Sequence, residues 1–214
     1  MTEQLKEWEN KFGKEYTKRN LITPEGVDRL YKERYGLTRT QMNKKFLDSL
    51  NRDMKILEVG ANIGLQLNLL SRMGFKNLYG IEINSYAIKV FREVNKGLPF
   101  YIIKASAFDI PFKDNYFDLV FTSGVLIHIH PKDIKISINE IYRCSKKYIW
   151  GLEYFSDKGY EEVNYRRKSK MLWKTNFRKL YLEVFPKLKS VKEELFSYIE
   201  EPHLIDQMFL FEKR

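Results

Sequence analysis

Short apolar segments alternate with helical patterns through the middle of the chain, and this alternation restricts the fold more than any other feature. Five apolar runs bounded by Gly, Asp, Asn or Lys have the character of buried strands. They are residues 54–59, 77–83, 100–105, 117–122 and 147–154, and helical patterns at 64–73, 85–95 and 131–145 separate them. Because a helix between two strands returns the chain in a right-handed crossover, the alternation predicts a parallel sheet covered by helices.

The segments that flank this core have different patterns. The segment before Met54 is typical of helices, with a helix start at Pro24 and a stop at Gly36. After Phe155 comes a basic and aromatic stretch, expected to be helical to about Phe185, and then two strands at 188–199 and 207–213 that close the sheet. We therefore expect one domain with four parts: a helical cap (1–50), a core (51–155), an insertion (156–186) and closing strands (187–214).

The composition fits one α/β domain. A chain of 214 residues that is 43% hydrophobic and 15% aromatic can bury one good core. The N-terminus is charged and lacks the apolar stretch of a signal peptide, and the most apolar segment, 119–129, is too short to span a bilayer. Cys144 is the only cysteine, which excludes a cysteine-cluster metal site and fits a reducing cytoplasm. We expect a cytoplasmic protein with no membrane span and no metal.

The formal net charge of +10 has two interpretations. It indicates either a polyanionic partner, such as nucleic acid or a phosphorylated substrate, or a lysine-rich composition without a functional meaning. Lysine and arginine are spread along the chain, with one cluster after the last core strand: Arg166, Arg167, Lys168, Lys170, Lys174 and Arg178. Charge alone does not choose between these interpretations.

The first core strand leads into an unusual loop, "ILEVGANIGLQ" at residues 56–66. In an open parallel sheet, ligands bind beyond the carboxyl ends of the strands, and this loop lies there. A dinucleotide fingerprint would need glycines where the chain has Asn62 and Leu65, and no G-K-[ST] follows for a phosphate-binding P-loop. The spacing is instead E-x-G-x-x-x-G, from Glu58 through Gly60 to Gly64. This disfavours NAD and a P-loop nucleotide.

Glu82 ends the next strand and completes a nucleoside-binding pattern with this loop. A carboxylate there can accept hydrogen bonds from both hydroxyls of a ribose. Asn62 is compatible with the turn, because Asn is among the few residues that adopt a left-handed backbone at small cost, and its side chain could bind a ligand carboxylate. The loop and Glu82 together favour an adenosine-type ligand.

The segments "ILEVGANIG", "YGIEIN", "ASAFDIPF" and "FDLVFTSGVLIHI", in this order, resemble class I S-adenosylmethionine (SAM)-dependent methyltransferases over roughly residues 40–155. The segments "EWENKFGKEYTKRN", "LEVGANIGLQLN" and "YRRKSKMLWKTNF" also resemble the methylases associated with pseudaminic acid biosynthesis, over nearly the whole chain. This resemblance implies a Rossmann-like, seven-stranded, mostly parallel sheet flanked by helices, a closing antiparallel strand pair, a helical N-terminal lid and SAM as the cofactor.

The resemblance also implies which residues bind the cofactor. Glu58 would face its amino group, Gly60 and Gly64 would let the main chain approach its methionine part, and Glu82 would bind its ribose. The other implied contacts are Ile83 against the adenine face, Ser106, Ala107 and Phe108 at the adenine edge, Thr122 and Ser123 near the sulfonium, and Tyr16, Arg19 and Asn20 in a lid over the methionine end. The family usually has Gly at position 62 and Asp at position 106, so Ser106 is expected to bind adenine more weakly.

Methyl transfer needs an aligned nucleophile and, where the nucleophile carries a proton, a base. The candidates for the base are His128, just after the fourth strand, and Glu153, at the end of the fifth. The alternative for His128 is a helix-start histidine that bonds to the backbone, and the alternative for Glu153 is a structural salt bridge. His130, beside Pro131, has the character of a helix cap.

The basic stretch after the fifth strand is the expected acceptor site. Arg166, Lys170, Lys174 and Arg178 would form one stripe if the segment were helical, with aromatic residues between them. A solvated face is the alternative, but such a stripe could also bind a carboxylate or phosphate. We expect Arg166 and Lys174 to hold the anionic group of the acceptor, with Tyr154 and Tyr165 shaping its pocket.

The resemblance and the basic stretch together favour a small anionic acceptor, a nonulosonic acid-type sugar or its nucleotide-linked precursor, methylated on oxygen or nitrogen. One alternative is an RNA methyltransferase that uses the basic surface, although the sequence contains no pattern of an RNA-binding module. Another is a protein that binds SAM without catalysis. The sequence does not indicate an oligomeric state.

Overall fold

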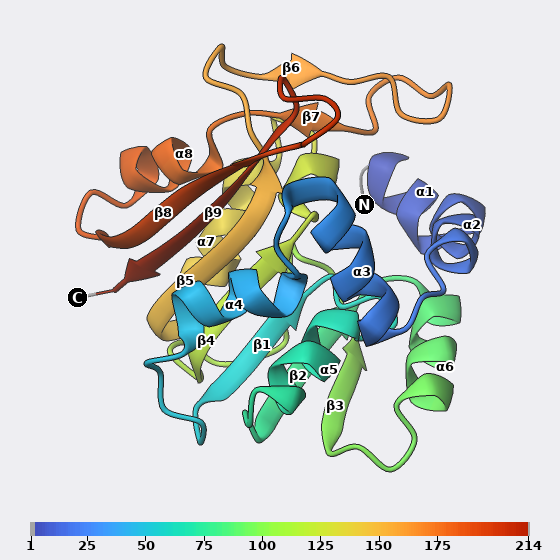
Figure 1. Ribbon diagram of the computed structural model, residues 1–214, viewed down its shortest axis with the longest axis vertical. Helices are drawn as coiled ribbons and strands as arrows, with labels where there is room; N and C mark the ends of the chain where they lie inside the picture. The colour runs from blue at the N-terminus through green and yellow to red at the C-terminus, as the bar shows by residue number, and fades with distance from the viewer. Residues whose placement is uncertain (1–2, 214) are drawn as a thin grey trace.

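The structure, a computed structural model that describes residues 3–213, contains a seven-stranded sheet with helices on both faces (Figure 1). The strand order is β3-β2-β1-β4-β5-β9-β8. The strands are β1 (Lys55–Val59), β2 (Asn77–Glu82), β3 (Phe100–Lys104), β4 (Phe117–Ser123), β5 (Ser145–Tyr154), β8 (Lys189–Ser197) and β9 (Ile205–Glu212). β1 to β5 are parallel, and β9 is antiparallel to both β5 and β8. The predicted parallel sheet and its closing antiparallel pair are confirmed.

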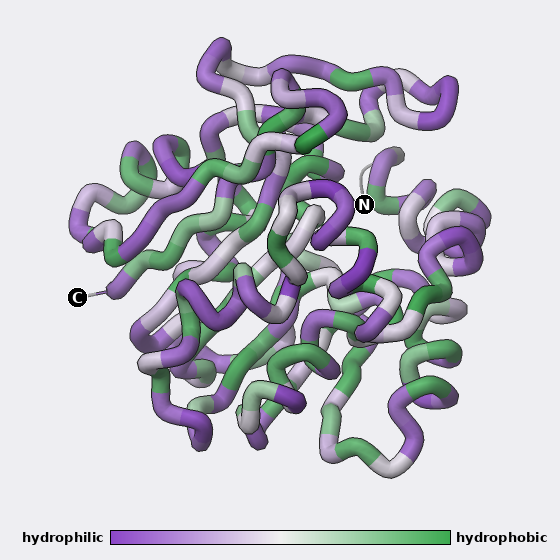
Figure 2. Tube along the Cα trace, viewed as in Figure 1, coloured by the Kyte–Doolittle hydropathy of each residue, from purple (hydrophilic) through white to green (hydrophobic). Residues whose placement is uncertain are grey.

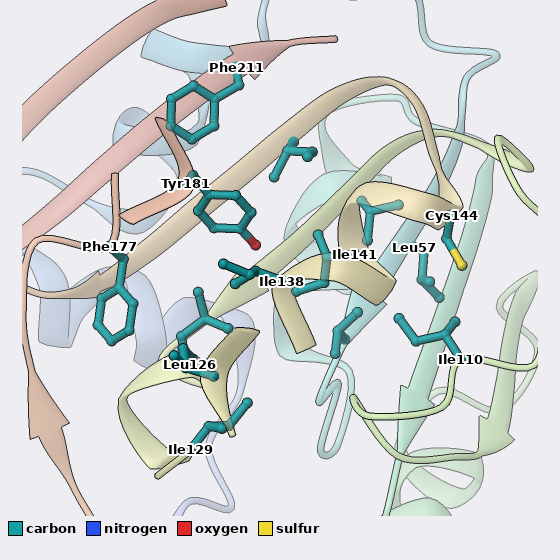
Figure 3. Close-up of a cluster of buried hydrophobic side chains, with 14 of the residues drawn as sticks. Leu57, Ile110, Leu126, Ile129, Ile138, Ile141, Cys144, Phe177, Tyr181 and Phe211 are labelled. Carbon is teal, nitrogen blue, oxygen red and sulfur yellow. The ribbon is translucent and has the colours of Figure 1, made fainter. Parts of the chain in front are cut away.

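Two apolar layers cover the sheet. On one face, Leu57 of β1 lies in a cluster with residues of α7 (Ile134–Cys144) and α8 (Phe177–Val184), including Ile138 and Tyr181 (Figure 3). On the other face, Ile56 lies in a cluster with α4 (Arg39–Leu47), α5 (Leu65–Arg72) and α6 (Ser85–Val94). Successive side chains of a strand point to opposite faces. Burial on both faces therefore explains why the central strands are continuous apolar runs.

The edge of the sheet at the closing pair is polar. β8 is largely exposed along its length, whereas the interior residues of β9 are buried. Figure 2 shows this contrast as a hydrophilic β8 beside a more hydrophobic β9. A charged, exposed edge strand resists pairing with other chains.

Four described helices precede β1: α4 and, before it, α1 (Glu3–Glu9), α2 (Lys11–Arg19) and α3 (Pro24–Tyr35). α3 begins at Pro24, where Thr23 accepts a hydrogen bond from the Gly26 N–H at 3.1 Å, and it ends at Gly36, whose φ is +76°. Both predicted helix signals are confirmed. α1 and α2 lie beside α6, at the carboxyl end of the sheet (Figure 1).

Asn84 joins this helix pair to the sheet. Its Nδ2 donates to the carbonyls of Trp8, Glu9 and Asn10 at 2.8, 3.0 and 3.1 Å, and its Oδ1 caps the N-terminus of α6. Asn84 stands two residues after Glu82, the last residue of β2. The position of the helix pair is thus fixed by the same strand end that was predicted to bind ribose.

The predicted basic helix from residue 165 is wrong. Arg166, Arg167 and Lys170 have positive φ angles of 53°, 62° and 56°, which no right-handed helix contains. The segment instead forms a turn and a short antiparallel pair, β6 (Glu161–Glu162) with β7 (Trp173–Lys174), and α8 begins only at Phe177. Three successive residues, 171–173, are buried, so the chain crosses the core in extended form rather than presenting one helical face.

Among the described residues, 3–213, no helix has both the length and the apolar character needed to cross a membrane.

Candidate active site

A cavity of about 400 Å³ lies at the carboxyl ends of the parallel strands. Its wall is formed by residues of α1, α2 and α3, the loops after β1, β2, β3 and β4, and the ends of β5 and β9. The volume is within the range of small-molecule sites, and the position is where open parallel sheets bind ligands.

Many of the predicted site residues line this cavity. From the predicted cofactor set, these are Tyr16, Glu58, Gly60, Asn62, Glu82, Ile83, Ala107, Phe108 and Ser123. The candidate base His128 and the predicted acceptor residues Tyr154 and Tyr165 line it as well. The residues found elsewhere are Arg19, Gly64, Ser106, Thr122, Glu153, Arg166 and Lys174. The structure thus brings together the strand-end residues and separates them from the basic stretch.

The loop after β1 has the backbone that its sequence predicts. Asn62 has a φ of +46°, and Gly60 and Gly64 have φ values of +74° and +80°. The Asn62 N–H donates to Glu82 Oε2 at 2.9 Å, which ties the loop to the end of β2. The Asn62 Oδ1 atom is buried and has no hydrogen-bond partner.

Two buried carboxylates face the cavity. Glu82 accepts the Asn62 N–H on one oxygen and the Asn84 N–H, at 2.8 Å, on the other, and burial raises its pKa despite these bonds. Burial raises the pKa of Glu58 well above its usual value, and Glu58 Oε2 has no partner. Because buried acceptors are normally paired, Glu58 Oε2 and Asn62 Oδ1 indicate a ligand that brings donors. The ammonium and ribose hydroxyls of SAM fit this need.

His128 is held as a neutral acceptor. Its Nδ1 lies 2.8 Å from the Met171 carbonyl oxygen. Because a carbonyl only accepts, Nδ1 carries the proton and Nε2 keeps its lone pair. Burial lowers the pKa of His128 to about 4, and the rings of Trp8 and Tyr165 flank it at 4.5 and 5.2 Å between centroids. A neutral, oriented imidazole of this kind can take a proton from a substrate.

Glu153 does not contact the cavity, contrary to the sequence prediction. Its side chain is 1% exposed, and its two oxygens accept the backbone N–H groups of Val125 and Ile127 at 3.2 and 3.3 Å. Burial raises its pKa to about 7. Glu153 therefore fixes the turn that carries His128, the short 3₁₀ helix Leu126–His128, instead of acting on a substrate.

Other predicted cofactor contacts serve the fold. Arg19 is exposed at the end of α2. Gly64 packs against α6, since a Cβ on it would lie 2.4 Å from the Phe91 ring. Ser106 Oγ accepts the Phe108 N–H at 3.1 Å and closes a turn. Thr122 is 2% exposed and hydrogen-bonds to Glu153. For Gly64, Ser106 and Thr122, a local partner takes the place that the ligand was expected to fill.

The predicted anion-binding stripe is dispersed. Arg166 is exposed outside the cavity wall. Lys174 lies 3.5 Å from Glu161, and Arg178 lies 3.1 Å from Glu193. Because the segment is not helical, these cations do not share a face, and two of them already have acidic partners.

The polar residues of the cavity wall that were missed at the sequence level include Tyr31 and Arg34 of α3 and Asp206 of β9. Asp206 had a usable signal, because it is a carboxylate at the start of the apolar strand "IDQMFLF". Arg34 had none, since it is one of 38 lysines and arginines in the chain.

Comparison with known proteins agrees with this geometry. Residues 57–148 match the family model described as a methyltransferase domain. Cycloartenol-C-24-methyltransferase 1 of Oryza sativa subsp. japonica is 31% identical over 97 residues, which are 44% of this chain. The chain spans only 28% of the length of that relative.

Solved structures share the fold. A SAM-dependent methyltransferase from Methanosarcina mazei superposes with a TM-score of 0.63 at 18% identity, covering 78% of this chain and 95% of that one. The 1,6-didemethyltoxoflavin-N1-methyltransferase of Burkholderia thailandensis, solved with S-adenosylhomocysteine, gives 0.62 at 13% identity, with coverage of 81% and 76%. At these identities the likeness concerns the fold alone.

Residues 57–148 are thus similar to a methyltransferase domain. The strand order and the loop between Gly60 and Gly64 agree with the class I SAM-dependent methyltransferase fold expected from the sequence. In methyltransferases of this kind, SAM supplies an electrophilic methyl group on a sulfonium. The narrower resemblance to pseudaminic acid-associated methylases is not tested by these comparisons.

Two substitutions at Asn62 separate its backbone from its side chain. Asn62→Gly keeps the left-handed turn, whereas Asn62→Ala strains it by about 1–2 kcal/mol. Both remove the unpartnered Oδ1. If this atom binds the cofactor, we expect both variants to bind SAM more weakly by roughly tenfold, and only the alanine variant to be less stable in urea. If calorimetry shows that Asn62→Gly binds SAM as tightly as the wild type does, the Asn62 side chain does not contact the cofactor.

Proposed function

We propose that the protein transfers the methyl group of SAM to an oxygen or nitrogen of a small anionic acceptor, in particular a nonulosonic acid-type sugar or its nucleotide-linked precursor. The observation that carries this proposal is one cavity lined both by Glu58, Asn62 and Glu82, at the ends of β1 and β2, and by His128. The proposed cofactor site and the candidate base therefore share one cavity.

We assign the roles of the cavity residues from their positions and from the two buried acceptors without a partner, Glu58 Oε2 and Asn62 Oδ1. Glu82 binds the ribose, and Glu58 and the Asn62 amide receive the donors at the methionine end. Ile83, Ala107 and Phe108 enclose the adenine, and Ser123 lies near the methyl group. His128 accepts the acceptor's proton on Nε2 as the methyl group is displaced in line. Closure by α1 and α2 keeps water from the reacting atoms.

The cavity favours a small acceptor over RNA. Glu58, Glu82 and Asp206 line it, with Arg34 as the one lysine or arginine among its described lining residues. One guanidinium can pair with one carboxylate, but it offers no row of cations for a polyphosphate chain. Most of the 38 lysines and arginines thus lie outside the cavity wall.

A transfer assay with labelled SAM tests the proposal. N-acetylneuraminate, its CMP conjugate and bulk RNA would each be offered as acceptor, and S-adenosylhomocysteine release would be measured. We expect release with a sugar acid and none with RNA. Methylation of RNA alone would reject the sugar acceptor, and SAM binding without transfer to any of them would indicate a protein that binds SAM without catalysis.

A further inference from the structure

We propose that Arg34 and Asp206 form the acceptor subsite, in which Arg34 binds a carboxylate of the acceptor and Asp206 accepts a hydrogen bond from a hydroxyl or amine next to it. This inference rests on the proposed function and names its acceptor class: a small carboxylic acid with an adjacent donor. It replaces Arg166 and Lys174, which lie outside the cavity wall.

Arg34 is held as a preorganised cation. Its guanidinium lies over the ring of Tyr198 at 4.9 Å and the ring of Tyr35 at 5.9 Å from the centroids. Its backbone carbonyl accepts the Ile199 N–H at 2.8 Å, which docks the tip of the β8–β9 hairpin on the end of α3. None of the ion pairs found within residues 3–213 includes Arg34. The guanidinium also hydrogen-bonds to Tyr35, and its remaining N–H groups are available to a carboxylate of a ligand.

Asp206 is fixed beside it. The carboxylate is 4% exposed and accepts the Tyr35 hydroxyl at 2.5 Å and the Tyr198 hydroxyl at 3.4 Å. The same two tyrosines therefore flank Arg34 and orient Asp206. Two hydrogen bonds leave the carboxylate oxygens with further lone pairs for a donor of the ligand. The carboxylate and the guanidinium are therefore both held in fixed positions in the cavity wall by the same two tyrosines.

The position of Arg34 and Asp206 relative to the strands indicates which end of the cavity would receive the acceptor. Glu58 and Glu82 end β1 and β2, whereas Tyr154 and Asp206 belong to β5 and β9, on the other side of β4 in the strand order. His128 follows β4, the strand that lies between β1 and β5 in the sheet. A substrate bound at Arg34 is thus on the far side of the candidate base from the ribose site.

The test uses protein loaded with S-adenosylhomocysteine and two probes. N-acetylneuraminate carries a carboxylate, and N-acetylmannosamine is a related neutral sugar without one. By calorimetry, we expect the wild type to prefer the acid by roughly 10- to 100-fold, the range for a charge-assisted bidentate contact. Arg34→Gln should abolish this preference, and Arg34→Lys should keep only part of it, because an ammonium lacks the planar fork.

Two further variants complete the test. Arg29→Gln removes an exposed arginine of the same helix, α3, and should leave the preference intact. Asp206→Asn should weaken both sugars alike, because it removes an acceptor and not the cation. All variants should bind S-adenosylhomocysteine as the wild type does, which excludes a general loss of structure.

The outcomes separate this inference from the proposed function. A wild-type protein that does not bind S-adenosylhomocysteine would overturn the proposed function. If it binds S-adenosylhomocysteine but takes both sugars equally, or if Arg34→Gln keeps the preference for the acid, the acceptor subsite is wrong and the cofactor site stands.

Discussion

Glu82→Ala is expected to weaken SAM binding by about 1–3 kcal/mol, or roughly 5- to 150-fold, with little change in the sheet. The wild-type carboxylate accepts the N–H groups of Asn62 and Asn84 and, in the proposed site, the ribose hydroxyls. Alanine leaves all of these donors unpaired in a buried place. Calorimetry with SAM measures the loss directly, and Glu82→Gln, which keeps one acceptor oxygen, should fall between the two.

Glu93→Ala is the matched control for this experiment. Glu93 lies on α6, shortly after Glu82, with 61% of its side chain exposed and a weak pairing with Lys89 at 3.9 Å. Its loss should not change the affinity for SAM. An alanine at position 82 that binds SAM as tightly as the wild type would show that the ribose is held by other groups.

The fold could be predicted from the sequence because its signals are local. The apolar strands, the helix start at Pro24 and the left-handed positions at Gly60 and Asn62 each depend on a few neighbouring residues. Once the strands are parallel, their carboxyl ends must meet at one edge of the sheet, which is why the loop after β1 and Glu82 of β2 line one cavity, as the combined pattern predicted.

The acceptor end could not be predicted in this way. Tyr35 and Asp206 are 171 residues apart, and no local pattern reports their hydrogen bond. Glu153 and Asp206 gave the same signal, an acid in an apolar strand, yet Glu153 meets backbone N–H groups while Asp206 meets two tyrosine hydroxyls at the cavity. Only the tertiary surroundings distinguish a carboxylate that supports a loop from one that faces a ligand.

The helix predicted for the basic stretch is wrong for a different reason. The regular spacing of its charges suggested a helix, but charges at the surface contribute little to the choice of backbone conformation. The burial of three successive residues, 171–173, contributes far more, at about 1.5–3 kcal/mol for each large apolar side chain. Burial of neighbouring residues in an extended chain therefore overrode the spacing of Arg166, Lys170 and Lys174.

His128→Asn is expected to reduce kcat by roughly 10²- to 10⁴-fold while the affinity for SAM is unchanged, if His128 is the base. An asparagine amide can still donate to the Met171 carbonyl, as Nδ1 does in the wild type at 2.8 Å, but it offers no counterpart of the Nε2 lone pair. The change therefore removes the proton acceptor and keeps the bond that orders the loop. The rate is measured with the acceptor that the transfer assay identifies.

The pH dependence gives a second readout. Because burial lowers the pKa of His128 to about 4, the imidazole is already neutral at pH 6, and the fall in the wild-type rate that comes from protonation of His128 should lie below about pH 5. His128→Asn should lose this acid limb. His130→Asn is the matched control, since His130 meets the Trp173 ring edge to face, with 5.0 Å between centroids, and lies outside the cavity wall. This variant should retain both the rate and the acid limb. A His128→Asn variant that keeps more than roughly a tenth of the wild-type kcat would show that the acceptor loses its proton without this base.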